Sequence, residues 1–147
     1  MYRHILVPTD GSALSEKAVH HAIALAKSIG ARVTAFHATP SYPRPVYTDA
    51  MVQDADVRKQ YASAASREAA SVLSPIERSA ASEAVHCEVV HAVADAPWQA
   101  ILDAAHRHKC DVIVMASHGR RGMAALLLGS ETVKVLTHAK VPVVVVR

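Results

Sequence analysis

"DVIVMAS", residues 111–117, is the stretch that decides the fold of this chain. The run between Asp111 and Ser117 is continuously apolar, without the alternation of a strand that has one face in water. Continuous apolar runs are typical of central strands in parallel sheets, because helices cover such strands on both faces. We therefore expect Asp111–Ser117 to form an inner strand of a parallel sheet.

Strand-like and helix-like stretches alternate on the N-terminal side of this run and follow it to the C-terminus. The other expected strands are "HILVP" (His4–Pro8), "RVTAFHA" (Arg32–Ala38), "VHCEVV" (Val85–Val90) and "VPVVVVR" (Val141–Arg147). Val85–Val90 alternates in the manner of a half-exposed edge strand. Strands joined by helices require crossover connections. The sequence thus predicts an α/β fold, a five-stranded parallel doubly wound (Rossmann-like) sheet with helices on both faces, as a single domain over residues 1–147.

Capping residues and apolar spacing locate the helices. The first helix begins at the N-cap Ser12, ends at Gly30, and has one apolar face: Ala18, Ala22, Leu25 and Ile29. The second covers Ala50 to about Ala81, with a kink or interruption expected at Ser74–Pro75. The third opens at Asp95 and Pro97, and its expected buried residues are Trp98, Ile101, Leu102 and Ala105. The last is expected to be capped by Ser130 and to end near His138.

Composition excludes several classes of protein. The chain has 147 residues, 51% of them hydrophobic and only 4% aromatic, with a net charge of +3. No Lys/Arg block is present and few aromatic residues could stack on bases, so we expect no nucleic-acid partner. No apolar run approaches the roughly 20 residues of a membrane span. Cys87 and Cys110 form no disulfide framework, which favours a reducing, cytoplasmic location.

The stretch "MASHGRRGMAALLLGSET" (Met115–Thr132) has the features of a phosphate cradle built from backbone. Gly119 and Gly122 permit positive φ and close backbone approach just after a strand. Gly129–Ser130 opens a helix, where free N–H groups and the helix dipole favour an anion. The stretch is neither GxxxxGK[ST], since it lacks the lysine, nor GxGxxG. The alternative is that these glycines only form turns around a capped helix.

Four segments together resemble a universal stress protein across essentially the whole chain: "ILVPTDGS", "MASHGRRG", "LLLGSETVKVLTHA" and "VPVVVVR". The nucleotide-binding pattern of that family is a glycine, two residues, a glycine, nine residues, and then glycine with Ser or Thr. Here Gly119 is the second glycine, residues 120–128 are the nine, and Gly129–Ser130 complete the pattern. Ala116 replaces the first glycine. Its methyl group either crowds a nucleotide or is harmless in ordinary strand geometry.

The resemblance implies a set of nucleotide-binding residues. At the adenine and ribose end these are Pro8, Thr9 and Asp10, with Ala38 bordering the base. Beneath the ribose and phosphates they are Met115, Ala116, His118 and Gly119, and around the phosphate tail Gly129, Ser130, Glu131 and Thr132. Glu131 suits an anion site only if its side chain points away or helps to hold a divalent cation. Asp10 could instead cap the first helix or order the "TDGS" turn.

The function implied is that of an ATP-binding cytosolic sensor or switch that helps cells survive stress, with ATP and Mg²⁺ as the expected cofactors. The alternatives are a slow ATPase at the same site and a nucleotide-independent stress interaction module. No spacing places a side chain in line with a γ-phosphate, so no catalytic residues are assigned. The ten histidines do not indicate zinc, because neighbouring pairs such as His20–His21 diverge.

The last strand predicts a partner. Four consecutive valines at an exposed sheet edge would invite aggregation unless something covers them. The same strand of a second subunit is the simplest cover, and the resemblance also implies a homodimer through Val141 to Val146. The alternative is a strand that is paired only within its own sheet. A further, unidentified protein partner is expected, and no membrane.

Overall fold

The computed structural model describes residues 1–42, 55–120 and 128–147. Strands and helices alternate along the chain, as the sequence predicts. They are β1 (His4–Pro8), α1 (Ala13–Ile29), β2 (Arg32–Thr39), α2 (Ala55–Ser82), β3 (Cys87–Val93), α3 (Pro97–Arg107), β4 (Val112–Ala116), α4 (Ser130–His138) and β5 (Val143–Val146).

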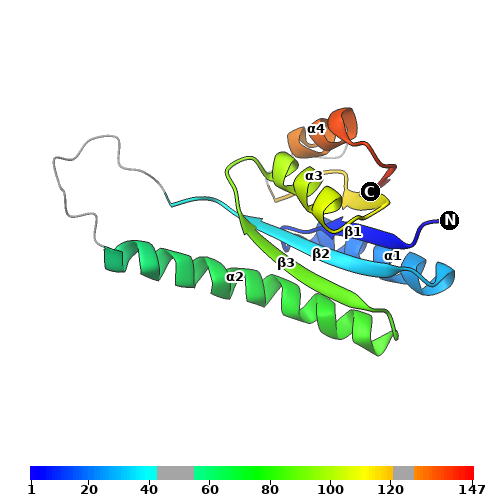
Figure 1. Ribbon diagram of the computed structural model, residues 1–147, viewed down its shortest axis with the longest axis horizontal. Coiled ribbons are helices and arrows are strands. Elements are labelled where there is room, and N and C mark those ends of the chain that lie inside the picture. The colour runs from blue at the N-terminus through cyan, green and yellow to red at the C-terminus, as the bar shows by residue number, and fades with distance from the viewer. Residues whose placement is uncertain (43–54, 121–127) are drawn as a thin grey trace.

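The strands form one parallel sheet in the order β3-β2-β1-β4-β5. From β1 the chain moves outward through β2 to β3, and then crosses to the other side of β1 for β4 and β5 (Figure 1). The strand order therefore reverses between β1 and β4. The predicted five-stranded, doubly wound sheet in a single domain is confirmed, and the reversal marks where such sheets bind ligands.

Helices cover both faces of the sheet. On one face, α1 and α2 pack over a core that includes Ile5, Val7 and Val114. On the other, α3 and α4 pack over Leu6 and Ile113, as well as the rest of a second cluster. Every residue of β4 is buried, so the prediction that "DVIVMAS" forms an inner strand is confirmed.

The predicted caps of α1 are also confirmed. Ser12 accepts a hydrogen bond from the Ser15 N–H through its side chain, at 3.3 Å. Gly30 adopts φ +69°, the left-handed conformation that closes many helices. The result is a helix that begins immediately after the loop that follows β1.

The second helix and the third strand differ from the prediction in their bounds. α2 continues through Pro75 without ending, because Leu73 and Ile76 anchor that turn on the sheet while Pro75 itself lies exposed. Residues 50–54 of the predicted helix lie outside the described residues. β3 does lie at a sheet edge, but it spans Cys87–Val93 rather than Val85–Val90, in register with the pairing residues of β2.

Three further predictions need correction. Trp98 and Leu102 are only half-buried, and the small residues Ala100 and Ala104 lie deeper on α3. Ser130 is not an N-cap: it is the first residue of α4, and Gly129 occupies the cap. The C-terminal strand begins at Val143 rather than Val141, because Pro142 has no N–H with which to donate a hydrogen bond to a neighbouring strand. Among the described residues, no helix is long and apolar enough to span a membrane.

Candidate functional site

The loops after β1 and β4 meet where the strand order reverses. The first loop runs from Thr9 to Ser12 and leads into α1. The second begins at Ser117 and returns at Gly129, before α4. Both leave the carboxyl ends of adjacent inner strands, so the predicted site residues of both loops come together here.

Thr9, at the start of the first loop, is hydrogen-bonded to β2 through both its backbone N–H and its carbonyl. The Thr9 N–H donates to the Phe36 carbonyl at 2.9 Å. The Thr9 carbonyl accepts from His37 Nδ1 at 2.8 Å. The Thr9 hydroxyl bonds to Ser15 Oγ at 2.9 Å and also accepts from the Gly11 N–H at 3.1 Å. Thr9 is also buried, and its hydrogen bonds hold the loop in place.

Asp10 joins the two loops. Its Oδ1 accepts from the Ser12 N–H at 2.9 Å, and its Oδ2 accepts from the Arg120 N–H at 2.7 Å. Burial alone would raise the pKa of Asp10, but hydrogen bonds from Ser12, and then from Arg120 and Ser15, lower it overall. The carboxylate is thus charged and orders the "TDGS" turn, one of the two roles expected from the sequence.

Gly119 is needed for this junction. A Cβ on Gly119 would collide with the Asp10 carboxylate, so the backbone of this residue lies against the first loop. Gly119 does not adopt the positive φ that a glycine permits. Gly122 and Arg121 lie outside the described residues. The Arg120 guanidinium lies beside Gly11 of the first loop, close to Val72 of α2.

The two ends of the glycine-rich stretch close on each other. The Gly129 N–H donates to the Ser117 carbonyl at 2.8 Å, and a Cβ on Gly129 would lie 3.1 Å from His118 Cα. Gly129 is the N-cap of α4 and has no side chain with which to cap it. The Ser130 side chain is exposed in the first turn. The start of α4 therefore presents backbone donors without a capping oxygen from its own N-cap residue.

Ala116 and Thr132 form a structural contact under this loop. The Thr132 hydroxyl donates to the Ala116 carbonyl at 3.0 Å, and both residues are buried. Ala116 ends β4 in pairing with Val146 and does not have a positive φ. Alanine therefore fits the strand geometry here without backbone strain.

The Glu131 side chain points to α3. Its Oε2 accepts from the backbone N–H of Trp98 at 2.8 Å, and its Oε1 lies 3.1 Å from Lys134 Nζ. The Trp98 ring packs against His138, with centroids 4.8 Å apart. Ala96, the N-cap of α3, makes no side-chain cap bond, so Glu131 supplies the missing acceptor.

The predicted base end is apolar. Pro8, Ala38 and Met115 come from three neighbouring strands near their carboxyl ends. Met115 belongs to the core cluster on the α3 and α4 face, and Ala38 packs against that cluster. Pro8 is buried in the same layer of strands. The three residues thus lie on neighbouring strands, beside the two loops.

Sequence reasoning missed the histidines that support the first loop. His37 is 4% exposed, and its Nε2 has no hydrogen-bond partner among the described residues. Its ring stacks on His91 at 6.4 Å, and His91 Nε2 bonds to Thr39 Oγ1 at 2.8 Å. Burial, and then the nearby His37, lower the pKa of His91. The only available signal was a histidine inside the apolar run "RVTAFHA".

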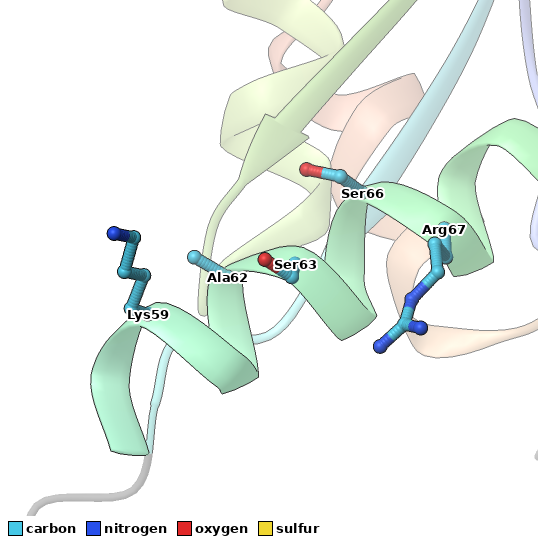
Figure 2. A pocket seen from close by; sticks show the side chains of 5 residues that line it. All are labelled: Lys59, Ala62, Ser63, Ser66 and Arg67. Carbon is cyan, nitrogen blue, oxygen red and sulfur yellow. The ribbon is translucent and has the colours of Figure 1, made fainter. Parts of the chain in front are cut away.

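A shallow depression lies elsewhere, along the first half of α2. Figure 2 shows that its lining side chains all project from this one helix: Lys59, Ala62, Ser63, Ser66 and Arg67. None of them belongs to the predicted site. Within the ranges 1–42, 55–120 and 128–147, no three His, Cys, Asp or Glu side chains gather in a group that could hold a metal ion.

Known proteins resemble this chain over its full length. It matches the profile of the universal stress protein family over residues 1–147. A Thermus aquaticus protein, named as the universal stress protein in the QAH/OAS sulfhydrylase 3' region, is 32% identical, with all of both chains covered.

Solved structures agree with the sequence comparisons. Universal stress protein UspA from Lactobacillus plantarum superposes with a TM-score of 0.84 at 26% identity, over 99% of this chain and 98% of that one. A universal stress protein solved in complex with cAMP gives a TM-score of 0.71 at 26% identity, over 99% of this chain and 97% of the other. The chain belongs to the universal stress protein family.

Proposed function

We propose that this chain binds an adenine nucleotide, ATP among them, where the loops after β1 and β4 meet, and that it serves as a cytosolic sensor or switch. The observation that carries the proposal is the junction of Asp10, Gly119 and the uncapped start of α4 at the reversal of strand order. A relative 26% identical to this chain was solved with cAMP, an adenine nucleotide.

The phosphates would be held at the start of α4. Gly129 makes no side-chain cap bond, and the first-turn N–H groups together with the helix dipole favour an anion. The Ser130 hydroxyl is exposed beside them and adds a donor. The base would rest near Pro8, Ala38 and Met115, where the surface is apolar.

Mg²⁺ fits such a site as a companion of the phosphates. It usually keeps several waters and is held by one or two carboxylates together with phosphate oxygens. The carboxylates here are Asp10 of the first loop and Glu131 of α4, and both accept hydrogen bonds from backbone N–H groups. The ion would therefore be carried mainly by the nucleotide.

Binding without efficient hydrolysis is the function we favour over a slow ATPase. A general base must be free to accept a proton. Asp10 accepts two backbone N–H bonds and its pKa is lowered, which makes it a weak base. His118 bonds to the Gly119 carbonyl at 3.3 Å through Nδ1. Neither geometry favours activation of a water.

The proposal includes a reducing cytosol and a homodimer. Cys87 and Cys110 are both free, and burial raises the pKa of the Cys110 thiol to about 11. β5 lies at a sheet edge with Val143–Val146 half-buried, and Val133 and Leu136 of α4 are exposed. These apolar groups favour a second copy as the cover for the β5 edge.

Calorimetry of nucleotide-stripped protein tests the proposal. We expect saturable binding of Mg-ATP or AMP, and Ser130→Ala should weaken it roughly 10-fold, since one hydrogen bond to a charged group is lost. Ser71→Ala is the matched control, because Ser71 is also an exposed helical serine and bonds only to the Glu68 carbonyl of its own helix. Absence of binding at millimolar nucleotide would favour the interaction module instead.

A further inference from the structure

Glu131 carries a negative charge at the end of the site where phosphates would lie. It is the second residue of α4 and directly follows Ser130. Its Oε2 accepts from the Trp98 N–H at 2.8 Å, and Trp98 is the second residue of α3. One carboxylate therefore lies at the N-terminal ends of two helices, the position that an anionic ligand would also favour.

The neighbouring cations compensate this charge only in part. Lys134 lies 3.1 Å from Glu131 Oε1, but both side chains are well exposed, at 46% and 38%, so the pair is weak and partly screened. The Arg120 guanidinium lies beside Gly11 of the first loop, close to Val72 of α2. Asp10 adds a second carboxylate at the junction of the loops. In the described part of the site, an anion would thus be held by backbone dipoles, in the presence of two fixed negative charges.

We propose that Glu131 is a specificity-determining residue that makes the site favour adenine nucleotides with few phosphate charges and disfavour metal-free ATP. This inference rests on the proposed nucleotide-binding function. Two like charges roughly 7 Å apart in nearly aqueous surroundings weaken association by about three-fold per added unit of charge. The penalty therefore grows from AMP through ADP to ATP, and a cation bound to the phosphates reduces it.

The variant that isolates the charge is Glu131→Gln. The glutamine amide oxygen can still accept from the Trp98 N–H, so the bond between α3 and α4 is kept while the charge is lost. Glu83→Gln is the matched control. Glu83 is also an exposed carboxylate paired with a lysine, Lys27, but it follows the C-terminal end of α2, at the opposite edge of the sheet. The net charge changes equally in the two variants.

The experiment measures dissociation constants for AMP, ADP and ATP in EDTA at low salt. The fluorescence of Trp98, the single tryptophan of the chain, serves as one readout and calorimetry as the second. We expect Glu131→Gln to tighten ATP binding about 3- to 10-fold and AMP binding clearly less, with the difference shrinking in high salt. Glu83→Gln should leave the ratio of the ATP and AMP constants unchanged.

Equal factors for AMP and ATP in Glu131→Gln would overturn the inference, because that result indicates a merely structural role. The same shift in Glu83→Gln would also overturn it, because net charge would then be the cause. If neither the natural chain nor Glu131→Gln binds any of the three nucleotides at millimolar concentration, the proposed function fails and this inference fails with it. If Glu131→Gln melts at the same temperature as the natural chain, the comparison is made between folded proteins.

Discussion

At the scale of single residues, Asp10 has the most consequential hydrogen bonds of the site. It joins two loops that are 110 residues apart in the chain, through the N–H groups of Ser12 and Arg120. The pattern "PTDGS" indicated a turn and a possible ligand contact, but it could not indicate the bond to Arg120. That bond requires β1 and β4 to be neighbours in the sheet.

Asp10→Asn tests the charge at this junction. An amide cannot accept well from both N–H groups, so we expect a loss of about 1 kcal/mol of unfolding free energy at pH 7. The pKa of Asp10 is lower in the folded state, so its stabilising contribution is present above the unfolded pKa and is lost as pH falls through the folded pKa. Urea unfolding from pH 7 to 3 should show the two proteins converging. A gap that is independent of pH would contradict this account.

His37 illustrates a residue whose role was invisible in the sequence. A histidine in an apolar strand is compatible with a buried side chain, a ligand or an edge position. The structure shows its Nδ1 bonded to the Thr9 carbonyl at 2.8 Å, which means that the ring donates a proton there. His37 thus supports the backbone on which Asp10 is mounted.

At the scale of elements, a buried hydroxyl links α4 to the end of β4. The Thr132 hydroxyl donates to the Ala116 carbonyl at 3.0 Å, and Thr132 is 2% exposed. The sequence places Thr132 near the phosphates by family resemblance. In the structure its side chain holds the helix whose N-terminus would receive them.

Thr132→Val should therefore cost stability. Valine keeps the shape and leaves the buried carbonyl without this partner, at a cost of about 1–3 kcal/mol. Thr137→Val is the control, since the Thr137 hydroxyl is exposed and bonds only to the Val133 carbonyl of its own helix at 2.8 Å. That change should stay within about 0.5 kcal/mol. Equal losses in guanidinium unfolding would show that the α4–β4 bond is not special.

At the scale of the whole molecule, the sheet has two edges of different character. β3 at one edge carries charged and polar residues, including Glu88 and His91, which discourage pairing with another chain. β5 at the other edge consists of four half-buried valines. The asymmetry favours association of two copies through β5 alone.

Val145→Lys tests that association. Val145 belongs to neither described core cluster, whereas its neighbours in β5 do, so a lysine there should perturb pairing more than folding. We expect a dimer for the natural chain and a monomer for this variant in sedimentation at micromolar concentration. Val93→Lys, at the 55% exposed end of β3, should remain a dimer. A natural chain that is monomeric at that concentration would contradict the proposed interface.

Much of the fold could be predicted from the sequence, because hydrophobic periodicity and helix capping act over only a few neighbouring residues. Hydrophobic periodicity placed β4 inside the sheet, and the caps of α1 follow from the conformational preferences of Ser12 and Gly30. Alternation of strands and helices then limited the topology to a doubly wound parallel sheet.

Only the tertiary structure decided where side chains with several possible partners would go. Glu131 could have faced a phosphate, a cation or water, and the arrival of α3 beside α4 directed it to the Trp98 N–H. Gly129 took the cap position expected for Ser130, and its backbone lies against His118. Contacts of this kind depend on which strands become neighbours, and local preferences carry no information about that.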